Sequence, residues 1–380
     1  MGLVPAAEST PLSPRDGGPA LDRDEPEVIV AISQGFAELS GEIDALAERA
    51  DAGPFVRRGW FEAWTAAFGG AERLHVVTVR RDGELVASIP LLRRRRGAFS
   101  SPTNWHTPAF GPIAVDDSAA GTLATAVVER APALLDVAFV APESAFASQL
   151  VSKAHAEGRL VVSRPVLRSP YVALEGTFES YEGNALSSKF RREIRRRTRK
   201  LEEHGKVEIA FEDGSERLAE LLDEGFAVEG SGWKDERGTA IASSPETERF
   251  YRDVAAWAQR SGWLQLGFLR LEGRAVAFML AIARGGEVDI VKVGFDPDWR
   301  KYGPGSILTR AAIERAYEQG MTRYDFLGGE DAYKLDWTDA VGERVRIQAF
   351  GRNAYGLAGY LAWRWGRPVA KRALELGRSR

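Results

Sequence analysis

A short segment in the second half of the chain combines residue types that can bind an anion. Arg300-Lys301-Tyr302-Gly303-Pro304-Gly305 has the spacing Arg-x-x-Gly-x-Gly and lies between a predicted strand and a predicted helix. Glycines let the backbone approach a ligand closely because they carry no Cβ. The first N–H groups of the helix, from Ser306 onward, would point at the anion, and the helix dipole would favour its negative charge. A pyrophosphate fits this chemistry; the alternative is a Pro-Gly turn that only starts a helix.

The composition excludes several other kinds of site. The 380 residues include no cysteine, which removes disulfides, thiol nucleophiles and iron–sulfur clusters. None of the four histidines is spaced from another as a helical metal pair would be, so we expect no metal. Charge-free stretches are shorter than the roughly 18 residues of a membrane span. Residues 1–25 lack the apolar region of a secretory signal, and we therefore expect a cytoplasmic protein.

The elements that must position this loop follow an order that occurs twice. A helix, a strand, a turn and a second strand are predicted in each half, and the turns Asp82-Gly83 and Glu272-Gly273 are each followed at the same offset by Val-Ala. A duplicated α/β unit is our preferred interpretation, although hairpins with such turns are common. The predicted elements are helices at 55–68 and 247–259, with strands at 74–80, 85–92, 263–271 and 275–283.

The second unit continues beyond its repeat. A strand at 287–295, the loop at 298–305, a helix at 306–318 and a strand at 322–327 follow, with a last strand predicted at 345–350. Such a series after antiparallel strands predicts an α/β fold with a mixed sheet. We expect a disordered leader at 1–25, a first domain at 26–165, a second at 166–350 and a basic, aromatic helical tail at 351–380.

Several motifs of the second half together resemble a known family. Arg-x-x-Gly-x-Gly at this place is the acyl-CoA pyrophosphate motif of the GNAT N-acyltransferase fold, and the whole set resembles the cellulose-biosynthesis-type bacterial acetyltransferases, which are related to the Fem-type aminoacyltransferases. The resemblance covers residues 180–340 well and 30–165 loosely. The matching segments are the basic stretch at 189–200, Glu229-Gly230-Ser231-Gly232-Trp233-Lys234, Lys292-x-Gly294-Phe295-Asp296, residues 302–308 and residues 324–337.

The resemblance implies two tandem GNAT-like domains, of which only the second has the acyl-CoA loop. The implied substrates are acetyl-CoA or another acyl-CoA and an amine, plausibly an amino sugar or a cell-envelope or polysaccharide precursor. The expected donor contacts are Arg300, Tyr302, Gly303, Gly305 and Ser306. Two alternatives remain: a non-catalytic accessory of a polysaccharide or membrane assembly, and a Fem-like transferase that uses aminoacyl-tRNA.

Amine acylation needs a group that takes a proton from the amine and one that protonates the leaving thiolate. Asp325, in a strand before Gly328-Gly329, and Glu229, before a glycine-rich break, are the candidate bases. Asp325 could instead bond backbone amides of the next loop, and Glu229 could cap the helix or pair with Lys234. Tyr333 is expected to protonate the thiolate by analogy with GNAT enzymes, although Tyr302 or Tyr324 could do so.

The remaining candidates would contact the acceptor. Trp233 and Lys234 lie on the glycine-rich break, where an aromatic ring could form a substrate wall. Lys292 on a central strand indicates a cleft, unless a salt bridge to Asp325 or Asp296 satisfies it. Core packing competes with a substrate role for Tyr333 and Trp337. The expected acceptor contacts are Trp233, Lys234, Lys292, Glu330, Lys334 and Trp337, with Lys334 facing a phosphate or an acidic substrate.

Basic segments suggest further anionic partners. The helix predicted at 189–200 has eight positive charges and one negative charge, with Phe190, Ile194, Arg197 and Leu201 on one narrow stripe. A solvated amphipathic helix is the default interpretation; the alternatives are binding of the CoA 3′-phosphate, a phosphorylated sugar donor, tRNA or anionic lipid. We expect no DNA partner, because stacking aromatics do not interrupt the charges. Aromatic residues beside Lys and Arg in the tail suit an anionic membrane surface, or packing on the second domain.

Overall fold

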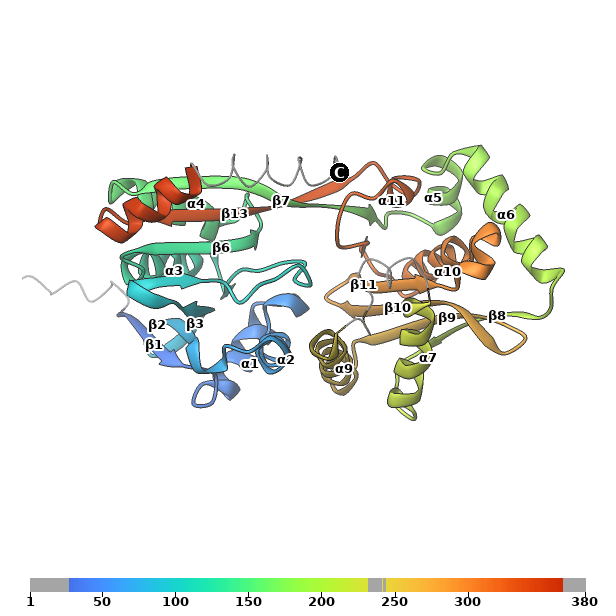
Figure 1. The fold of residues 1–380 in the computed structure, drawn as a ribbon, viewed down its shortest axis with the longest axis horizontal. Coiled ribbons are helices and arrows are strands. Elements are labelled where there is room, and N and C mark those ends of the chain that lie inside the picture. Colours follow the sequence, from blue (N-terminus) through green and yellow to red (C-terminus); the bar gives the residue numbers. More distant parts are fainter. Residues whose placement is uncertain (1–26, 232–240, 242–243, 365–380) are drawn as a thin grey trace, which may run out of the picture.

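The strands form one mixed sheet that runs through both halves of the protein. The computed structural model describes residues 27–231, 241 and 244–364. The strand order is β1-β2-β3-β4-β6-β13-β7-β12-β11-β10-β9-β8, and β5 pairs with β3 beside this path (Figure 1). Most neighbours are antiparallel, whereas β4 with β6 and β11 with β12 are parallel. The predicted mixed α/β sheet is confirmed.

The first half packs its helices on strands that are connected by short turns. Its elements are β1 (Val28–Gln34), α1 (Ser40–Arg49), α2 (Arg58–Phe68), β2 (Leu74–Arg81), β3 (Glu84–Arg93), β4 (Ala98–Ser100), β5 (Ile113–Ala114), α3 (Asp117–Arg130), β6 (Leu134–Val140), α4 (Ala145–Ala156) and β7 (Leu160–Ala173).

The second half contains the strand–loop–helix–strand series that the sequence predicts. Its elements are α5 (Phe178–Asn184), α6 (Ser188–Glu202), β8 (Val207–Glu212), α7 (Leu218–Gly230), α9 (Pro245–Arg260), β9 (Leu264–Leu271), β10 (Arg274–Arg284), β11 (Glu287–Phe295), the 3₁₀ turn η5 (Pro297–Tyr302), α10 (Pro304–Glu318), β12 (Arg323–Asp325), α11 (Ala332–Leu335) and β13 (Val341–Phe350).

The two predicted hairpins have the same turn geometry. Asp82 and Gly83 have φ values of 52° and 83°, and Glu272 and Gly273 have 49° and 79°. Two consecutive residues with positive φ are typical of the type I′ turn, whose twist matches that of the flanking strands. β2 pairs with β3, and β9 with β10, on either side of these turns. The repeated hairpin is therefore confirmed in both halves.

The halves meet through helices that hold equivalent places before the two hairpins. α2 packs against α9, and the rings of Trp60 and Phe250 lie edge-to-face with centroids 5.1 Å apart. A Cβ built on Gly59 would lie 2.2 Å from Nε1 of Trp257, so glycine at this position permits the close approach of the helices. The two repeated units thus contact each other through corresponding surfaces.

Two strands connect the halves along the top of Figure 1. β7 pairs with β13 through residues 160–170 and then with β12 through residues 171–173. β13 also pairs with β6 of the first half. The strand predicted at 345–350 is confirmed, and its partners lie in the first half and in β7. The domain boundary near residue 165 stays a prediction, and β7 continues through that position.

Two apolar clusters cover opposite faces of the second half's strands. Along β10, Phe278, Leu280 and Ile282 belong to a cluster that includes α7, α9 and the core of the first half. Met279 and Ala281 point to the other cluster, beneath α5, α6 and α10. One face of these strands is therefore continuous with the first half, as the alternation of side chains along a strand requires.

The last described helix, residues 354–364, packs beside the first half. The rings of Phe350 and Tyr360 are 5.6 Å apart, and Arg96 lies over Tyr355 at 4.3 Å. Leu357 and Leu361 are exposed. Phe350 ends β13 within the predicted second domain, whereas Arg96 belongs to the first, so packing on the second domain and contact with an anionic membrane both stay predictions. Among the described residues, no helix combines the length and apolarity needed to cross a membrane.

Candidate active site

A cavity opens where two parallel strands of the second half stop pairing. β11 and β12 pair only at residues 287–289 and 323–325. A cavity of about 580 Å³ is lined by the residues that follow on each side, 290–295 and 326–329. The start of α10 and the end of α7 supply further walls. A pocket of this size at strand ends is a typical place for a ligand.

The anion-binding loop forms one end of this cavity. Asp296 accepts a hydrogen bond from the Asp298 N–H and pairs with Arg274 at 2.7 Å, which fixes the turn η5. Gly303 then has a φ of +61° and α10 begins at Pro304. Among the described residues no side chain caps this helix, so the N–H groups of its first turn face the cavity without a capping partner there. Arg300, Gly303, Gly305 and Ser306 all line the cavity, as the sequence predicts for a donor site.

Tyr302 does not join this group. Its side chain is buried in the core beneath α6, and its hydroxyl lies 2.5 Å from Nε2 of His204. It is absent from the cavity wall. The 3₁₀ turn directs this side chain toward α6 rather than toward the cavity, so the structure does not bring Tyr302 together with the other expected donor contacts.

One residue of the basic helix, which was not among the expected donor contacts, lines the same end. Arg197 of α6 contacts the cavity beside Gly303. The signal was present in the sequence, because Arg197 is the one cation on a stripe that otherwise consists of Phe190, Ile194 and Leu201. A partly shielded cation on an otherwise apolar stripe indicates a specific partner more strongly than the solvated charges around it.

Glu229 lies in the cavity wall, on the face of the sheet that α7 covers. The residue is 1% exposed, and its Oε2 accepts a hydrogen bond from the Ile241 N–H at 2.8 Å. A Cβ on Gly294 would lie 2.5 Å from the Cα of Glu229, so this glycine allows α7 to approach β11 closely. The position is compatible with a base that meets an acceptor amine. Trp233 and Lys234, expected beside it, lie outside the described residues.

Asp325 occupies a different environment. Its Oδ1 accepts hydrogen bonds of 2.8 Å from the Ser169 hydroxyl and the Leu327 N–H, and its Oδ2 pairs with Arg323 at 2.8 Å. The side chain is buried and is not part of the cavity wall. Its Oδ1 holds the start of the loop in which Leu327 and Gly328 have positive φ. This geometry matches the structural alternative and does not support the role of base.

Lys334 is also occupied within the protein. Its ammonium donates to the carbonyl oxygens of Leu327 and Gly329, both at 2.8 Å, and pairs with Asp331 at 3.0 Å. It is 5% exposed and lines the cavity from behind this loop. These contacts shape the cavity wall, and a contact of Lys334 with a phosphate or an acidic substrate stays a prediction. Glu330 lies outside the wall and pairs with Arg168 at 3.3 Å.

Two aromatic residues of the predicted set line the cavity with different exposure. Trp337 is buried and packs edge-to-face on Phe190 at 5.0 Å, so core packing is its main contact. Tyr333 is half exposed at the edge of the cavity. Burial of its phenol, followed by the nearby charge of Asp331, raises the pKa of Tyr333. A tyrosine is protonated at neutral pH even without this shift, so the hydroxyl has a proton to donate.

Lys292 points to the first half of the protein. Its Nζ lies 5.2 Å from the ring centre of Trp105 and 5.0 Å from that of Tyr251. The salt bridges considered for it are not seen, since Asp296 pairs with Arg274 and Asp325 with Arg323. Lys292 also lines the cavity. The loop of the first half that holds Trp105 therefore lies close to the cavity wall.

His106 connects the halves beside this lysine. The residue is buried, its Nδ1 lies 2.8 Å from the Tyr251 hydroxyl, and its Nε2 lies 3.4 Å from Thr247 Oγ1. Burial, and then the charge of Lys292, lower the pKa of His106 to about 3. The imidazole is therefore neutral, and His106 is a contact between the halves rather than a surface residue.

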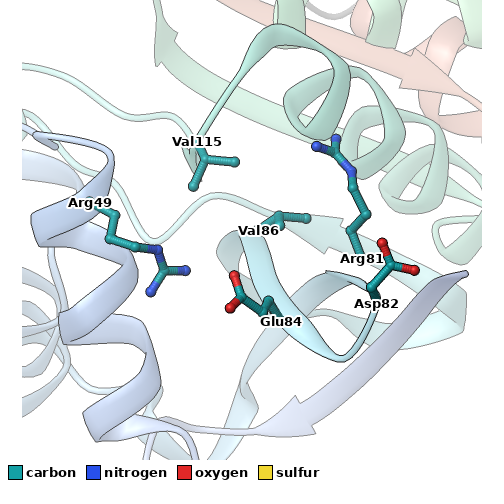
Figure 2. A pocket seen from close by; sticks show the side chains of 6 residues that line it. All are labelled: Arg49, Arg81, Asp82, Glu84, Val86 and Val115. Atoms are coloured by element: carbon teal, nitrogen blue, oxygen red, sulfur yellow. The ribbon is translucent and has the colours of Figure 1, made fainter. Parts of the chain in front are cut away.

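A second hollow, of about 510 Å³, lies in the first half around the β2–β3 turn (Figure 2). Its two cations are already engaged: Arg49 donates to the carbonyl oxygen of Leu85, and Arg81 pairs with Asp116 at 2.9 Å. Glu84 and Asp82 face the same space. This hollow offers no arrangement comparable to the loop at the end of the cavity.

Comparisons with known proteins agree with this geometry. Residues 188–335 match the family described as the acetyltransferase (GNAT) domain. No curated protein matches the chain.

Solved structures with similar folds include FemX, with 12% identity, a TM-score of 0.54 and coverage of 81% of this chain and 95% of that one. The C-terminal domain of a protein named as a lysylphosphatidylglycerol synthetase from Agrobacterium fabrum has 16% identity and a TM-score of 0.51, covering 82% and 94%. A conserved protein of unknown function from Bacteroides thetaiotaomicron has 12% identity and a TM-score of 0.52, covering 85% and 100%. At these identities the likeness concerns the fold, and it extends across both halves.

The match covers the strands, the anion-binding loop and the helix that surround the cavity. Residues 188–335 therefore form a GNAT acetyltransferase domain, and the protein is an acyltransferase.

Proposed function

We propose that this acyltransferase moves an acyl group from acyl-CoA to an amine, and that the amine belongs to an amino sugar or another cell-envelope or polysaccharide precursor. The observation that carries the proposal is the cavity between β11 and β12, which has anion-binding groups at one end and Glu229 and Tyr333 in its wall. Amides and arginines suit a diphosphate, and the apolar middle of the cavity suits a pantetheine arm.

The two wall residues supply the proton transfers of the reaction. The amine nitrogen forms a bond to the thioester carbonyl carbon, and the carbon–sulfur bond breaks. Glu229 takes the proton that the amine loses, and the Tyr333 phenol gives one to the departing sulfur. A phenol holds its proton at neutral pH, so Tyr333 has one to give when the thiolate forms.

The acceptor class is supported by fold neighbours alone. FemX and the lysylphosphatidylglycerol synthetase domain share the fold, and the name of the second refers to a membrane lipid product. An acceptor in the cell envelope is consistent with this likeness. The finer resemblance to cellulose-biosynthesis-type enzymes, the cytoplasmic location and contact with an anionic membrane stay proposals.

The donor is tested by calorimetry with acetyl-CoA. Gly305 lines the anion end, and a Cβ there would meet Phe295 at 3.5 Å, an ordinary contact. Gly305→Glu should weaken binding at least about tenfold relative to Gly305→Gln, because the added carboxylate repels the phosphates at a cost of more than about 1.4 kcal/mol. Equal affinities of the wild type and Gly305→Glu would remove the donor assignment.

The acceptor is tested by release of free thiol in a screen of acyl-CoAs against amino sugars and other amines. Turnover with an envelope precursor supports the proposal. No turnover, together with capture of a polysaccharide or membrane assembly, favours an accessory protein. Activity that is lost after RNase treatment favours aminoacyl-tRNA as donor.

A further inference from the structure

The helix α6 presents one arginine to the donor cavity. Its other cations include Arg192, Arg195 and Arg199, which are exposed to solvent. Arg197 instead lines the cavity together with Arg300 and the start of α10, which lies beside α6 in Figure 1. Its side chain is 35% exposed, so it is accessible to a ligand yet partly shielded from water.

The guanidinium of Arg197 is oriented by one acidic partner. Its Nε donates to Oε1 of Glu193 at 2.7 Å, four residues earlier on the same helix. Within the described part of the chain, its two Nη groups make no hydrogen bond or ion pair. Arg196 and Arg197 together lower the pKa of Glu193 to about 2, so this carboxylate stays charged and holds the arginine at neutral pH.

Gly303 gives Arg197 its position. A Cβ on Gly303 would lie 2.7 Å from Nη1 and 2.9 Å from Cδ of Arg197. The arginine therefore lies directly against the turn at which α10 begins. The glycine at 303 serves the close approach of this side chain as well as the positive φ of the turn.

These contacts place hydrogen-bond donors on more than one side of the anion-binding end of the cavity. The first-turn amides of α10 and Arg300 form one wall, and the Nη groups of Arg197 lie against the turn from α6. A planar guanidinium with two remaining Nη groups suits a phosphate, which it can bind through two parallel hydrogen bonds.

We propose that Arg197 binds the diphosphate of the acyl donor, so that α6 completes a site that the loop at 300–306 begins. This inference rests on the proposed use of acyl-CoA. It assigns a donor-binding role to a helix outside the Arg-x-x-Gly-x-Gly motif and explains why a cation occupies the otherwise apolar stripe of α6.

The test measures binding of CoA, dephospho-CoA and acetylpantetheine to Arg197→Met by calorimetry. A charge-assisted hydrogen bond contributes about 1.5–3 kcal/mol, so we expect CoA and dephospho-CoA to bind about 10- to 100-fold more weakly. Acetylpantetheine, which lacks the diphosphate, should bind the variant and the wild type equally. Arg197→Lys should recover part of the loss, because it restores the charge without the planar group.

Arg196→Met is the matched control. Arg196 pairs with the same Glu193 at 2.7 Å but does not line the cavity. We expect its CoA affinity to stay within about threefold of the wild type, which is less than about 0.7 kcal/mol.

Three results would overturn the inference while leaving the proposed function intact: a loss under threefold for Arg197→Met, an equal loss for acetylpantetheine, or a loss for CoA but not for dephospho-CoA. The third would move Arg197 to the 3′-phosphate. Absence of CoA binding by the wild type would overturn both proposals.

Discussion

The two carboxylates proposed as bases differ in what surrounds them. Glu229 lies in the cavity wall, whereas Asp325 lies outside it and accepts hydrogen bonds from β7, from its own strand and from the loop that follows. Sequence spacing places both residues near the site but does not show which way a side chain points. For the same reason it could not predict that Tyr302 and Lys334 turn to protein partners.

Glu229→Gln should lower turnover by about 10²–10⁴-fold with little change in CoA affinity, because an amide cannot take the amine's proton. Thiol release with the best amine of the screen, together with calorimetry, measures the two effects. Glu220→Gln on the exposed side of the same helix is the control and should keep full activity. A loss of less than about threefold for Glu229→Gln would assign proton removal to water or to another group.

Asp325→Asn should act mainly on stability. The amide keeps a similar shape but loses the charged pairing with Arg323, and a hydrogen bond to a charged group contributes about 1.5–3 kcal/mol. Urea unfolding should show a loss of that order, while the folded variant retains most of its turnover. A turnover loss above about a hundredfold with unchanged stability would return the catalytic role to Asp325.

At the scale of elements, local sequence patterns predicted turns and helix starts, but not the pairing of strands that are far apart in the chain. The hairpin turns and the helix start after Pro304 follow from residue types within a few positions, and the structure contains both. The pairing of β13 with β6 joins residues about 200 positions apart, and no local pattern specifies such a contact. Arg197 reaches the loop only because α6 lies against η5.

The helix α7 positions Glu229 through a glycine contact that can be tested. A Cβ on Gly225, one turn before Glu229, would lie 2.3 Å from the Phe278 ring. Gly225→Ala should push α7 from the sheet, destabilise the protein by about 1–3 kcal/mol and lower turnover. Denaturant unfolding and thiol release measure both effects.

The matched control is Gly121→Ala in the middle of α3. A Cβ there meets only Gln149, at 3.6 Å, so alanine should stabilise the protein by about 0.5–1 kcal/mol. Equal effects of the two substitutions would contradict the close packing of α7.

At the scale of the whole molecule, the site depends on both halves. One apolar cluster runs from the first half into α7 and α9, and Trp105 of the first half contacts the lysine in the cavity wall. The repeated turn motif indicated a duplicated unit, but it could not show that the units share a core. A buried, neutral His106 at this junction makes the contact sensitive to acid.

The sign of that sensitivity follows from the lowered pKa of His106. In the folded protein the pKa of His106 is about 3, whereas in the unfolded chain it has the ordinary value of 6.5. Between these two pH values the unfolded chain therefore binds one proton more than the folded protein does. Stability from this residue is therefore complete above about pH 6.5 and falls as the pH decreases.

At 1.36 kcal/mol per pKa unit, acidification to pH 5 should lower the free energy of unfolding by about 2 kcal/mol. The pH dependence of urea unfolding in His106→Gln should be shallower by this amount, whereas His155→Gln, which changes an exposed histidine, should retain the wild-type dependence. An unchanged dependence in His106→Gln would mean that the junction opens before it unfolds and lets the imidazole titrate in the folded protein.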